Sequence, residues 1–580
     1  MKKTNRIGIG IAAVSSVTAL ALILSGCSSS SESSSSGSSS SSSESGDKAG
    51  EAVGGLKIDV KPAGDYNEKS RDELKDGGEL TLALGELTEQ QNAFHANMTT
   101  DTGAVWNWYN PQLALFDGAG NFTPNPAYIT NASEETKDGK TVVTFDINEK
   151  AKFNDDTPID VKAFQNTWKL NNGEDADVQP NSTDGYEQIE SVEAGDSDKQ
   201  VVVTFKGAYP WWQGLFNQLL HPAVNTAQLY NEAYLNKLHP EYGAGPFKVD
   251  TVDFNAGTVT FVPNEKWWGD APKLSKVIFR QMESQATINA FQAGEIDAAG
   301  VGSKNNLTVA AGMGDAIDVR AATRPATSLI TLNSRSPLLG DAKVRQAIME
   351  GIDRSQLAAI RFNGLGYSED LPGSLTLYPT QEGYQDNFSK AVSFDAEKSK
   401  SLLDEAGWAE GGDGVREKDG EKLSLRYVLI GDDEISKSLA TALQKMMKNI
   451  GIDLQVEERP SSDFSKIAKE RDFDVFLSGI ASSDPFGVAY FGQTWMSDSD
   501  LNKSGTGTKE LDEKILELQA LPTAEEQTKK ANELEVEAFS TYGLMPLFNG
   551  PSMVGVKKGL ANFGAAGFAV LPKENIGWEK

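Results

Sequence analysis

The stretch GAGPFKVDTVDFNAGTVTFVPNEKWWG, residues 243–269, decides the fold of the chain. It opens with a Gly-Ala-Gly-Pro turn, whose glycines reach backbone angles that are closed to other residues. Two alternating segments follow, residues 247–249 and 258–262, with Asn255-Ala256-Gly257 as the turn between them. The aromatic pair Trp267-Trp268 closes the stretch. Taken alone, the pattern predicts a β-hairpin with a stiff entry.

The N-terminus has the pattern of a secretion signal followed by a tether. Three basic residues precede an apolar run that ends in Leu-Ser-Gly-Cys, a sequence that resembles the lipobox of bacterial lipoproteins. We expect residues 1–26 to be a signal peptide and Cys27, the only cysteine, to carry a lipid anchor. Residues 27–55 begin with a nearly pure Ser segment and are expected to form a flexible tether. The sequence thus indicates a lipid-anchored protein on the extracytoplasmic face of the cell membrane.

The charge of the chain limits its partners. The formal net charge is −29, from 54 Lys and Arg against 83 Asp and Glu. Nucleic acid binding needs a basic face, so this balance argues against it. It also argues against adhesion to anionic lipid, which leaves the lipid on Cys27 as the membrane contact. The body after the tether is too long for one hydrophobic core and implies two or more lobes.

Strand and helix patterns alternate along this body, which indicates an α/β fold. Strands are expected at residues 79–84, 141–147, 201–205, 277–280, 329–333 and 544–548. Helices are expected at residues 209–220, 286–294, 341–362, 510–521 and 523–542, the last with a capping box at Thr523 and Glu526. Residues 423–458 predict a βαβ unit with a helix over 434–449.

Catalytic and metal-binding motifs find no support. The three histidines, His95, His221 and His239, are far apart and none has the two-His spacing of a metal-binding helix. Gly550-Pro551-Ser552 lacks the closing glycine of a nucleophile elbow. We therefore expect no enzyme activity, no catalytic residue, no metal ligand and no cofactor.

Four ordered blocks resemble one family, the large extracytoplasmic solute-binding proteins of peptide and nickel ABC transporters. The resemblance runs from about residue 78 to residue 548. It rests on residues 243–247 with 267–269, on 142–163 with its Lys-Phe-Asn-Asp-Asp-Thr-Pro turn, on 332–333 with 344–354, and on 401–408. Ordered blocks at consistent distances are far more specific than any one block alone.

The resemblance implies two α/β lobes that are joined by two chain crossings and close on a ligand like a flytrap. Mapped onto this chain, lobe I would comprise residues 75–247 plus 548–580, and lobe II residues 248–547. The first crossing would lie at Gly243, Gly245, Pro246 and Phe247, and the return at Pro546. The implied partners are a small solute, most simply a peptide, and an ABC permease, with the binding protein itself a monomer.

One departure from the family pattern concerns the ligand. Peptide-binding members place an acidic residue, which holds the free amine of the peptide, three positions before the acid of an Asp-Pro or Glu-Pro pair. Here Asp484-Pro485 is the pair and Ala481 occupies that position. Either another group captures the amine, with Asp484 as the candidate, or the ligand is not an ordinary peptide.

Aromatic side chains are the expected walls of the cleft, because flat rings cover a variable ligand without demanding its sequence. Each of them has core packing as the competing interpretation. The candidate ligand-binding residues are Asn97, Trp106, Trp108, Tyr109, Trp211, Trp212, Asp484, Phe486, Tyr490, Phe491 and Trp495. Two alternatives to peptide binding stay open: an oligosaccharide bound on the same scaffold, and an extracytoplasmic hydrolase or chaperone.

Overall fold

Residues 243–269 form the expected hairpin in the computed structural model, which describes residues 52–482 and 484–580. Strand β8 (Phe247–Asp253) pairs antiparallel with β9 (Thr258–Pro263). The hairpin joins β10 (Lys276–Gln281) and β1 (Glu79–Leu84) in a sheet of order β1-β10-β9-β8. The predicted signal peptide and the anchor at Cys27 lie outside the described residues.

The last residues of the expected tether are packed on the folded body. Ala52 is buried, and the N–H of Val53 donates to the carbonyl of Gly364 at 3.0 Å. Farther along, Lys61 forms a β-bridge with Ala322. The boundary predicted at residue 55 is therefore corrected: the chain is already packed on the body at residue 52, because apolar side chains follow the Ser-rich segment.

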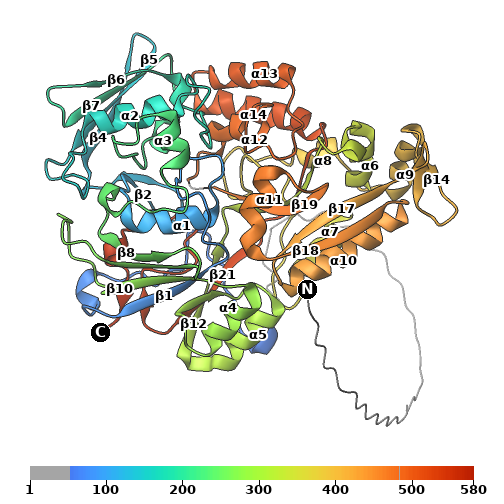
Figure 1. The fold of residues 1–580 in the computed structure, drawn as a ribbon, viewed down its shortest axis with the longest axis horizontal. Helices are drawn as coiled ribbons and strands as arrows, with labels where there is room; N and C mark the ends of the chain where they lie inside the picture. The colour runs from blue at the N-terminus through green and yellow to red at the C-terminus, as the bar shows by residue number, and fades with distance from the viewer. Residues whose placement is uncertain (1–51, 483) are drawn as a thin grey trace, which may run out of the picture. The chain divides into compact units, whose positions relative to one another are not determined.

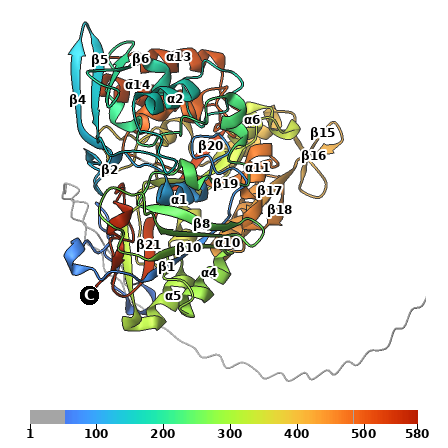
Figure 2. The ribbon, with the colours of Figure 1, turned by 60° about the vertical axis from the view of Figure 1, so that its left-hand side comes forward.

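Two more sheets complete the first lobe (Figure 1). Strand β21 (Pro551–Lys557) pairs antiparallel with β11 (Ala298–Gly300) and β12 (Ile317–Thr323). The third sheet has the order β4-β5-β7-β6, in cyan and teal at the upper left of Figure 1, and Figure 2 shows its long β4–β5 hairpin. Its strands are β4 (Ile129–Lys137), β5 (Lys140–Ile147), β7 (Gln200–Phe205) and β6 (Ile189–Ala194).

The helices of the first lobe start at polar caps. Thr99 caps α1 by accepting from the N–H of Thr102, and Asp160 caps α2 as predicted. The elements are α1 (Thr100–Tyr109), α2 (Val161–Asn171), α3 (Ala227–Glu232), α4 (Ser284–Gln292) and α5 (Lys304–Met313), with short strands β2 (Ala114–Phe116), β3 (Phe122–Pro124), β22 (Leu560–Ala561) and β23 (Gly577–Trp578). The helix predicted over residues 209–220 is wrong, since only the 3-10 turn Trp212–Gly214 forms there.

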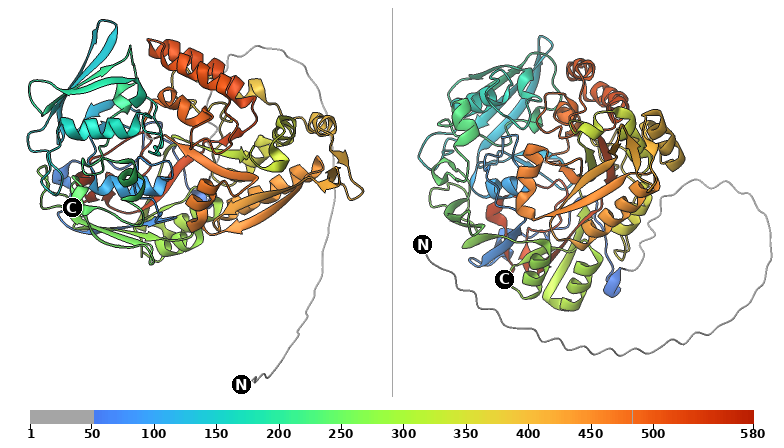
Figure 3. Two further views of the ribbon diagram at one scale, coloured as in Figure 1. Left: turned by 45° about the horizontal axis from the view of Figure 1, so that its top comes forward. Right: turned by 45° about the vertical axis from the view of Figure 1, so that its right-hand side comes forward.

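The second lobe is built on a five-stranded sheet of order β18-β17-β19-β13-β20. The predicted βαβ unit is present: β17 runs parallel to β18 and the helix between them, α10, lies along the strands, in orange in Figures 1 and 3. The bounds are β13 (Ala326–Leu332), β17 (Ser424–Ile430), α10 (Glu434–Asn449), β18 (Asp453–Arg459), β19 (Val475–Ala481) and β20 (Leu544–Phe548).

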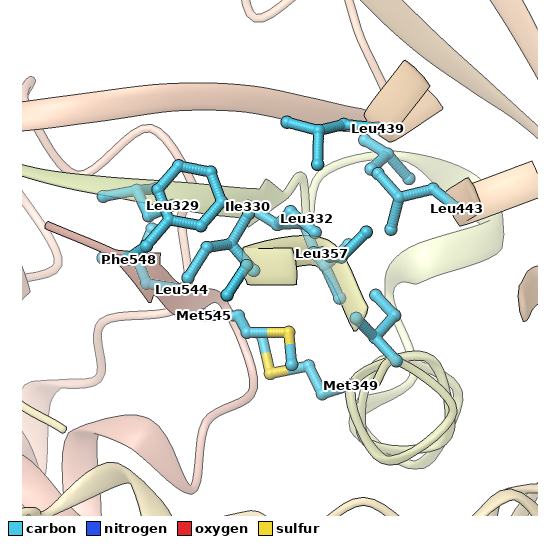
Figure 4. Packing of buried hydrophobic residues seen from close by; sticks show 14 of the residues in the cluster. Leu329, Ile330, Leu332, Met349, Leu357, Leu439, Leu443, Leu544, Met545 and Phe548 are labelled. Atoms are coloured by element: carbon cyan, nitrogen blue, oxygen red, sulfur yellow. The ribbon is translucent and has the colours of Figure 1, made fainter. Parts of the chain in front are cut away.

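Helices surround this sheet and supply its core. The expected helix over residues 341–362 forms as two, α6 and α7, with Asp353 capping the second. The bounds are α6 (Ala342–Glu350), α7 (Arg354–Arg361), α8 (Phe388–Ala391), α9 (Ala396–Glu405), α11 (Phe464–Glu470), α12 (Phe491–Trp495), α13 (Lys509–Gln519) and α14 (Ala524–Phe539), and a small sheet contains β14 (Ala409–Glu410), β15 (Arg416–Lys418) and β16 (Glu421–Lys422). Figure 4 shows Ile330 of β13, Met545 of β20 and Met349 of α6 meeting in the core.

The sheets correct the predicted boundary between the lobes. Strands β8, β9 and β10 share a sheet with β1, and β11 and β12 pair with β21, so residues 248–323 belong to the first lobe. The chain crosses between lobes at Arg324-Pro325, between β12 and β13, and returns at Asn549-Gly550, between β20 and β21. Pro546 lies inside β20, paired with Leu329, close to the return but not at it.

Candidate ligand-binding cleft

A cavity of about 420 Å³ lies between the two lobes, a size typical of small-molecule sites. The first lobe contributes residues 96–100, the loop that leads into α1. The second lobe contributes side chains from β13, α11, β19 and α12 and from residues 501–503. The cavity thus lies where a ligand would touch both lobes at once.

One wall of this cavity is a strand edge. Strand β19 pairs with β13 along its whole length, but it pairs with β17 only at Val475 and Phe476. Beyond Phe476 the two parallel strands separate, and Ser478, Gly479, Ile480 and Ala481 line the cavity. A strand without a neighbour on one side offers backbone N–H and C=O groups to an extended ligand.

A second cavity, of about 480 Å³, flanks the chain crossings. Its lining includes Arg324 and Pro325 of the first crossing and Asn549 and Gly550 of the return. The carboxylate of Glu369 accepts from the N–H of Asn549 at 2.8 Å and from the N–H of Gly550 at 2.9 Å. Burial raises the pKa of Glu369, although these hydrogen bonds oppose the shift. Arg324 lines both cavities, so they meet at the first crossing.

Carboxylates of the first lobe bind donors of the second. Glu86 accepts from the N–H and Oγ of Ser465 at 3.2 and 2.5 Å. Glu283 accepts from the N–H and Oγ of Ser461 at 2.8 and 2.6 Å. The lobes are therefore held together by charge-assisted hydrogen bonds, which are stronger than neutral ones.

Asp184 is the most deeply buried of these carboxylates. Its oxygens accept from the backbone N–H of Gln493 and from Nε2 of Gln519, both at 2.7 Å. Burial, with the negative charge of Glu187 nearby, raises the pKa of Asp184 to about 7. Both donors belong to the second lobe, so this buried carboxylate lies in the contact between the lobes.

Most of the predicted aromatic walls are packed inside the protein. Trp106, Trp108, Tyr109, Trp212, Phe491 and Trp495 expose between 0 and 7% of their surface and belong to hydrophobic cores. None of them lines either cavity between the lobes. The prediction for these six is corrected, since large rings in an α/β body are needed first to fill its cores.

The other predicted residues lie at the cavity or at the contact between the lobes. Asn97 lines the first cavity. The indole Nε1 of Trp211 donates to Oε1 of Gln527 in the second lobe at 2.7 Å, and its ring lies 6.2 Å from that of Phe486. These contacts join the lobes beside the cavity.

Asp484, the proposed amine ligand, is not among the residues that line either cavity. Its carboxylate accepts from the N–H of Phe486 at 2.9 Å and from the hydroxyl of Tyr490 at 2.7 Å, and the side chain is 1% exposed. Ala481, in contrast, lines the first cavity. The position at which the family resemblance implies an acid is therefore apolar and lies in the cavity wall.

The sequence reasoning missed the charged residues of the cavity, Arg324, Lys469 and Lys503. They come from the first crossing, from α11 and from the loop after α12, and no local pattern links them. Within residues 52–482 and 484–580, no group of three or more His, Cys, Asp or Glu side chains is placed to hold a metal ion. In the same residues, no helix combines the length and apolar character needed to cross a bilayer.

Comparison with known proteins identifies a family model and several relatives that this chain matches. Residues 123–502 match the family model described as bacterial extracellular solute-binding proteins, family 5 Middle. The oligopeptide-binding protein OppA of Mycobacterium tuberculosis (strain H37Rv) is 32% identical over 527 residues, which cover 90% of this chain and 88% of OppA. The nickel-binding periplasmic protein of Escherichia coli (strain K12) is 27% identical over 374 residues, which cover 63% of this chain and 68% of that protein.

Solved structures share the fold. The oligopeptide-binding protein AppA of Bacillus subtilis, in complex with a nonapeptide, matches with a TM-score of 0.73 at 19% identity and covers 87% of this chain and 100% of AppA. The periplasmic EDTA-binding protein EppA matches with a TM-score of 0.75 at 24% identity and covers 89% of this chain and 98% of EppA. The predicted two-lobed α/β fold is confirmed by these likenesses.

Proposed function

Because the chain belongs to the bacterial extracellular solute-binding proteins of family 5, whose members bind solutes for ABC importers and are not enzymes, we propose that it captures short peptides. The peptide would lie in the cavity between the lobes, and the closed protein would deliver it to an ABC permease. The relative of highest identity reported above, OppA, is named for oligopeptides.

The free edge of β19 is the observation that carries the peptide proposal. Residues 478–481 of β19 line the cavity and are not paired with β17. An extended peptide can therefore pair with this edge as a further strand. Main-chain hydrogen bonds of this kind accept any side-chain sequence, and neighbouring pockets then set the preference. Opposite the edge, residues 96–100 of the first lobe supply the polar groups of Asn97 and Thr99.

The oligosaccharide alternative loses one of its two supports. The many aromatic residues favoured it, but six of the candidate aromatics are packed in cores. The missing amine-binding acid, at Ala481 in the cavity wall, still favours it. The rings that line the first cavity are Phe464 and Phe476. A phenylalanine ring lacks the O–H of Tyr and the N–H of Trp, which can hydrogen-bond to a sugar that stacks on the ring.

Differential scanning fluorimetry of the purified full-length chain tests the choice of ligand. We expect short peptides to raise the melting temperature, because a ligand that binds only the folded state stabilises it by mass action. A matched panel of glycans should leave it unchanged. Stabilisation by glycans and by no peptide would overturn the proposal.

Anchoring at Cys27 is a separate proposal, supported by the lipobox-like sequence that precedes it. Cys27→Ala should release the protein into the medium, because the acyl chains supply the membrane affinity of a lipoprotein. Fractionation followed by immunoblotting checks this. Retention of the variant in the membrane fraction would contradict it.

A further inference from the structure

We propose that the cavity between the lobes selects anionic ligands: solutes, short peptides among them, that carry two or more carboxylates. The inference rests on the proposed function in that it takes this cavity as the ligand site. It adds a prediction of the charge of the ligand, which family membership and the relatives do not determine.

Every charged residue that lines the first cavity is a cation. Arg324 reaches it from the first crossing, Lys469 from α11 and Lys503 from the loop after α12, and no Asp or Glu is among the lining residues. This occurs in a chain with 83 acidic and 54 basic residues, in which a random patch of surface would be negative. A cleft lined by one sign of charge focuses the field and attracts ligands of the opposite sign.

These cations are not used inside the protein. Within residues 52–482 and 484–580, none of the three forms an ion pair with an Asp or Glu. Arg324 is exposed to the cavities, whereas Lys503 is half-buried. Lys503 is partly withdrawn from water, and charged groups in that position are usually paired because desolvation is costly. Here a bound carboxylate would be the missing partner.

Further positive charge stands behind the cavity wall. Burial, and then the nearby charge of Arg471, lowers the pKa of Lys503 to about 8, which still leaves the amine mostly protonated at neutral pH. Burial lowers the pKa of Arg361, and the nearby positive charge of Arg324 lowers it further. The acids Asp500, near Lys503, and Asp433 and Glu369, near Arg361, offset part of this positive charge, and an anionic ligand would relieve the repulsion that remains.

The facing wall does not neutralise them. Residues 96–100 of the first lobe present Asn97, Thr99 and Thr100, which are polar but uncharged. Glu86, also on the first lobe, is occupied by the N–H and Oγ of Ser465. The site therefore lacks the acid that would hold the amine of a peptide, and it offers several donors to carboxylates, for which the Arg guanidinium is well shaped.

Isothermal titration calorimetry with three matched tripeptides tests the inference on the full-length chain. The probes are Glu-Gly-Glu, Gln-Gly-Gln and Lys-Gly-Lys, with citrate as a polycarboxylate that is not a peptide. We expect Glu-Gly-Glu to bind at least about tenfold more tightly than Gln-Gly-Gln, the gain of one hydrogen-bonded charge. Its affinity should fall as salt is added, and Lys-Gly-Lys should bind most weakly.

Variants identify the cations responsible. Lys469→Gln, Lys503→Gln and Arg324→Gln should each weaken binding of Glu-Gly-Glu by a larger factor than binding of Gln-Gly-Gln, whose only carboxylate is its C-terminus. Lys466→Gln is the matched control, because Lys466 is an exposed cation on the same helix α11 and does not line the cavity. Arg324→Lys keeps the charge and should keep the preference for Glu-Gly-Glu. Melting temperatures check that each variant is folded.

The outcomes separate the inference from the proposed function. Equal affinities for the acidic and the neutral tripeptide would overturn the inference and leave peptide binding intact. Binding of citrate without any peptide would support the anionic cavity and overturn the peptide as ligand. Loss of preference in Lys466→Gln as well as in Lys469→Gln would also overturn the inference, because the effect would then come from net charge and not from the cavity.

Discussion

Two segments of this protein place a glycine directly before a proline, at Gly245-Pro246 and Gly550-Pro551, and have different structural roles. The Gly-Ala-Gly-Pro turn at residues 243–246 is locked against α1: the N–H groups of Ala244 and Gly245 both donate to the carbonyl of Tyr109 at 2.9 Å. The Asn549-Gly550 segment instead carries the chain from one lobe to the other, between β20 and β21. Gly550 takes a φ of +69°, which favours glycine.

The difference shows that strand pairing, and not glycine content, marks the crossing between lobes. A hinge is defined by which sheets the flanking strands join, and that depends on residues far away in the chain. Strand β8 remains with the first lobe because β10, with which it shares a sheet, pairs with β1, about 200 residues earlier. The first crossing, Arg324-Pro325, contains no glycine at all.

The largest effect is expected at the locked turn. A Cβ on Gly245 would lie 3.0 Å from the backbone carbon of Tyr109 and 3.2 Å from the carbonyl oxygen of Trp108, so Gly245→Val must displace backbone. We expect a loss of folding free energy of about 3 kcal/mol, at the upper end of overpacking effects. Urea unfolding measures it, with Gly207→Val, whose Cβ meets nothing within 4 Å, as control. Intact folding with lost ligand binding would restore residues 243–247 as a hinge.

The contacts between lobes should respond to pH, unlike the locked turn. The pKa of Asp184 is raised from its ordinary 3.8 to about 7 in the closed protein, so closing takes up a proton between these values. Ligand affinity should therefore fall as pH rises through this window, by at most about tenfold per pH unit, and become constant above it.

Asp184→Asn should remove most of this pH dependence while keeping an acceptor for the N–H of Gln493. Glu187, whose charge acts on Asp184, stays in place in the variant. Calorimetric titrations at several pH values compare the two proteins. An unchanged pH profile in the variant would assign the dependence to another group.

A smaller effect is expected at the return crossing. Glu369→Gln replaces the carboxylate that accepts from the N–H groups of Asn549 and Gly550 with an amide that accepts with one oxygen. The loss of one charge-assisted hydrogen bond should destabilise the return crossing by about 1.5–3 kcal/mol. Amide hydrogen exchange at residues 549 and 550 should accelerate, whereas Asp370→Asn, an exposed neighbour, should not change it. Equal acceleration in both variants would contradict the role of Glu369.

The smallest effect is expected at the rim of the lobe contact. Trp211→Phe removes the hydrogen bond from Nε1 to Gln527 and keeps an aromatic ring beside Phe486. One net hydrogen bond is worth about 1 kcal/mol, so peptide affinity should fall only a few-fold. Calorimetry with Glu-Gly-Glu measures the change. A loss of binding would mean that Trp211 contacts the ligand, as the sequence first indicated.

Several local patterns were predicted correctly because their physical cause is local. The hairpin of β8 and β9, the βαβ unit around α10, and the caps at Asp160 and Thr523 all depend on residues within one short segment. The predicted helix over 209–220 failed, because Phe216 adopts a φ of +55° and the segment turns repeatedly to fill the core.

The site was less predictable than the fold. Its cations stand at positions 324, 469 and 503 and meet only through the pairing of β13 with β19 and the packing of α11. The aromatic residues, in contrast, form clusters along the sequence, yet a ring-rich segment such as α1 fills cores just as readily as it lines a cleft. Asn97 lines the first cavity because it lies in the polar loop before α1, and its role in ligand binding stays a prediction.

Hydrogen exchange with mass spectrometry tests the central claim, capture between the lobes, most directly. With saturating Glu-Gly-Glu, we expect slower exchange in both walls of the first cavity: residues 96–100 of the first lobe, and residues 478–481 and 501–503 of the second. Residues 106–109, which are packed in cores, should exchange at an unchanged rate. Protection confined to one lobe, or centred on residues 106–109, would contradict the account.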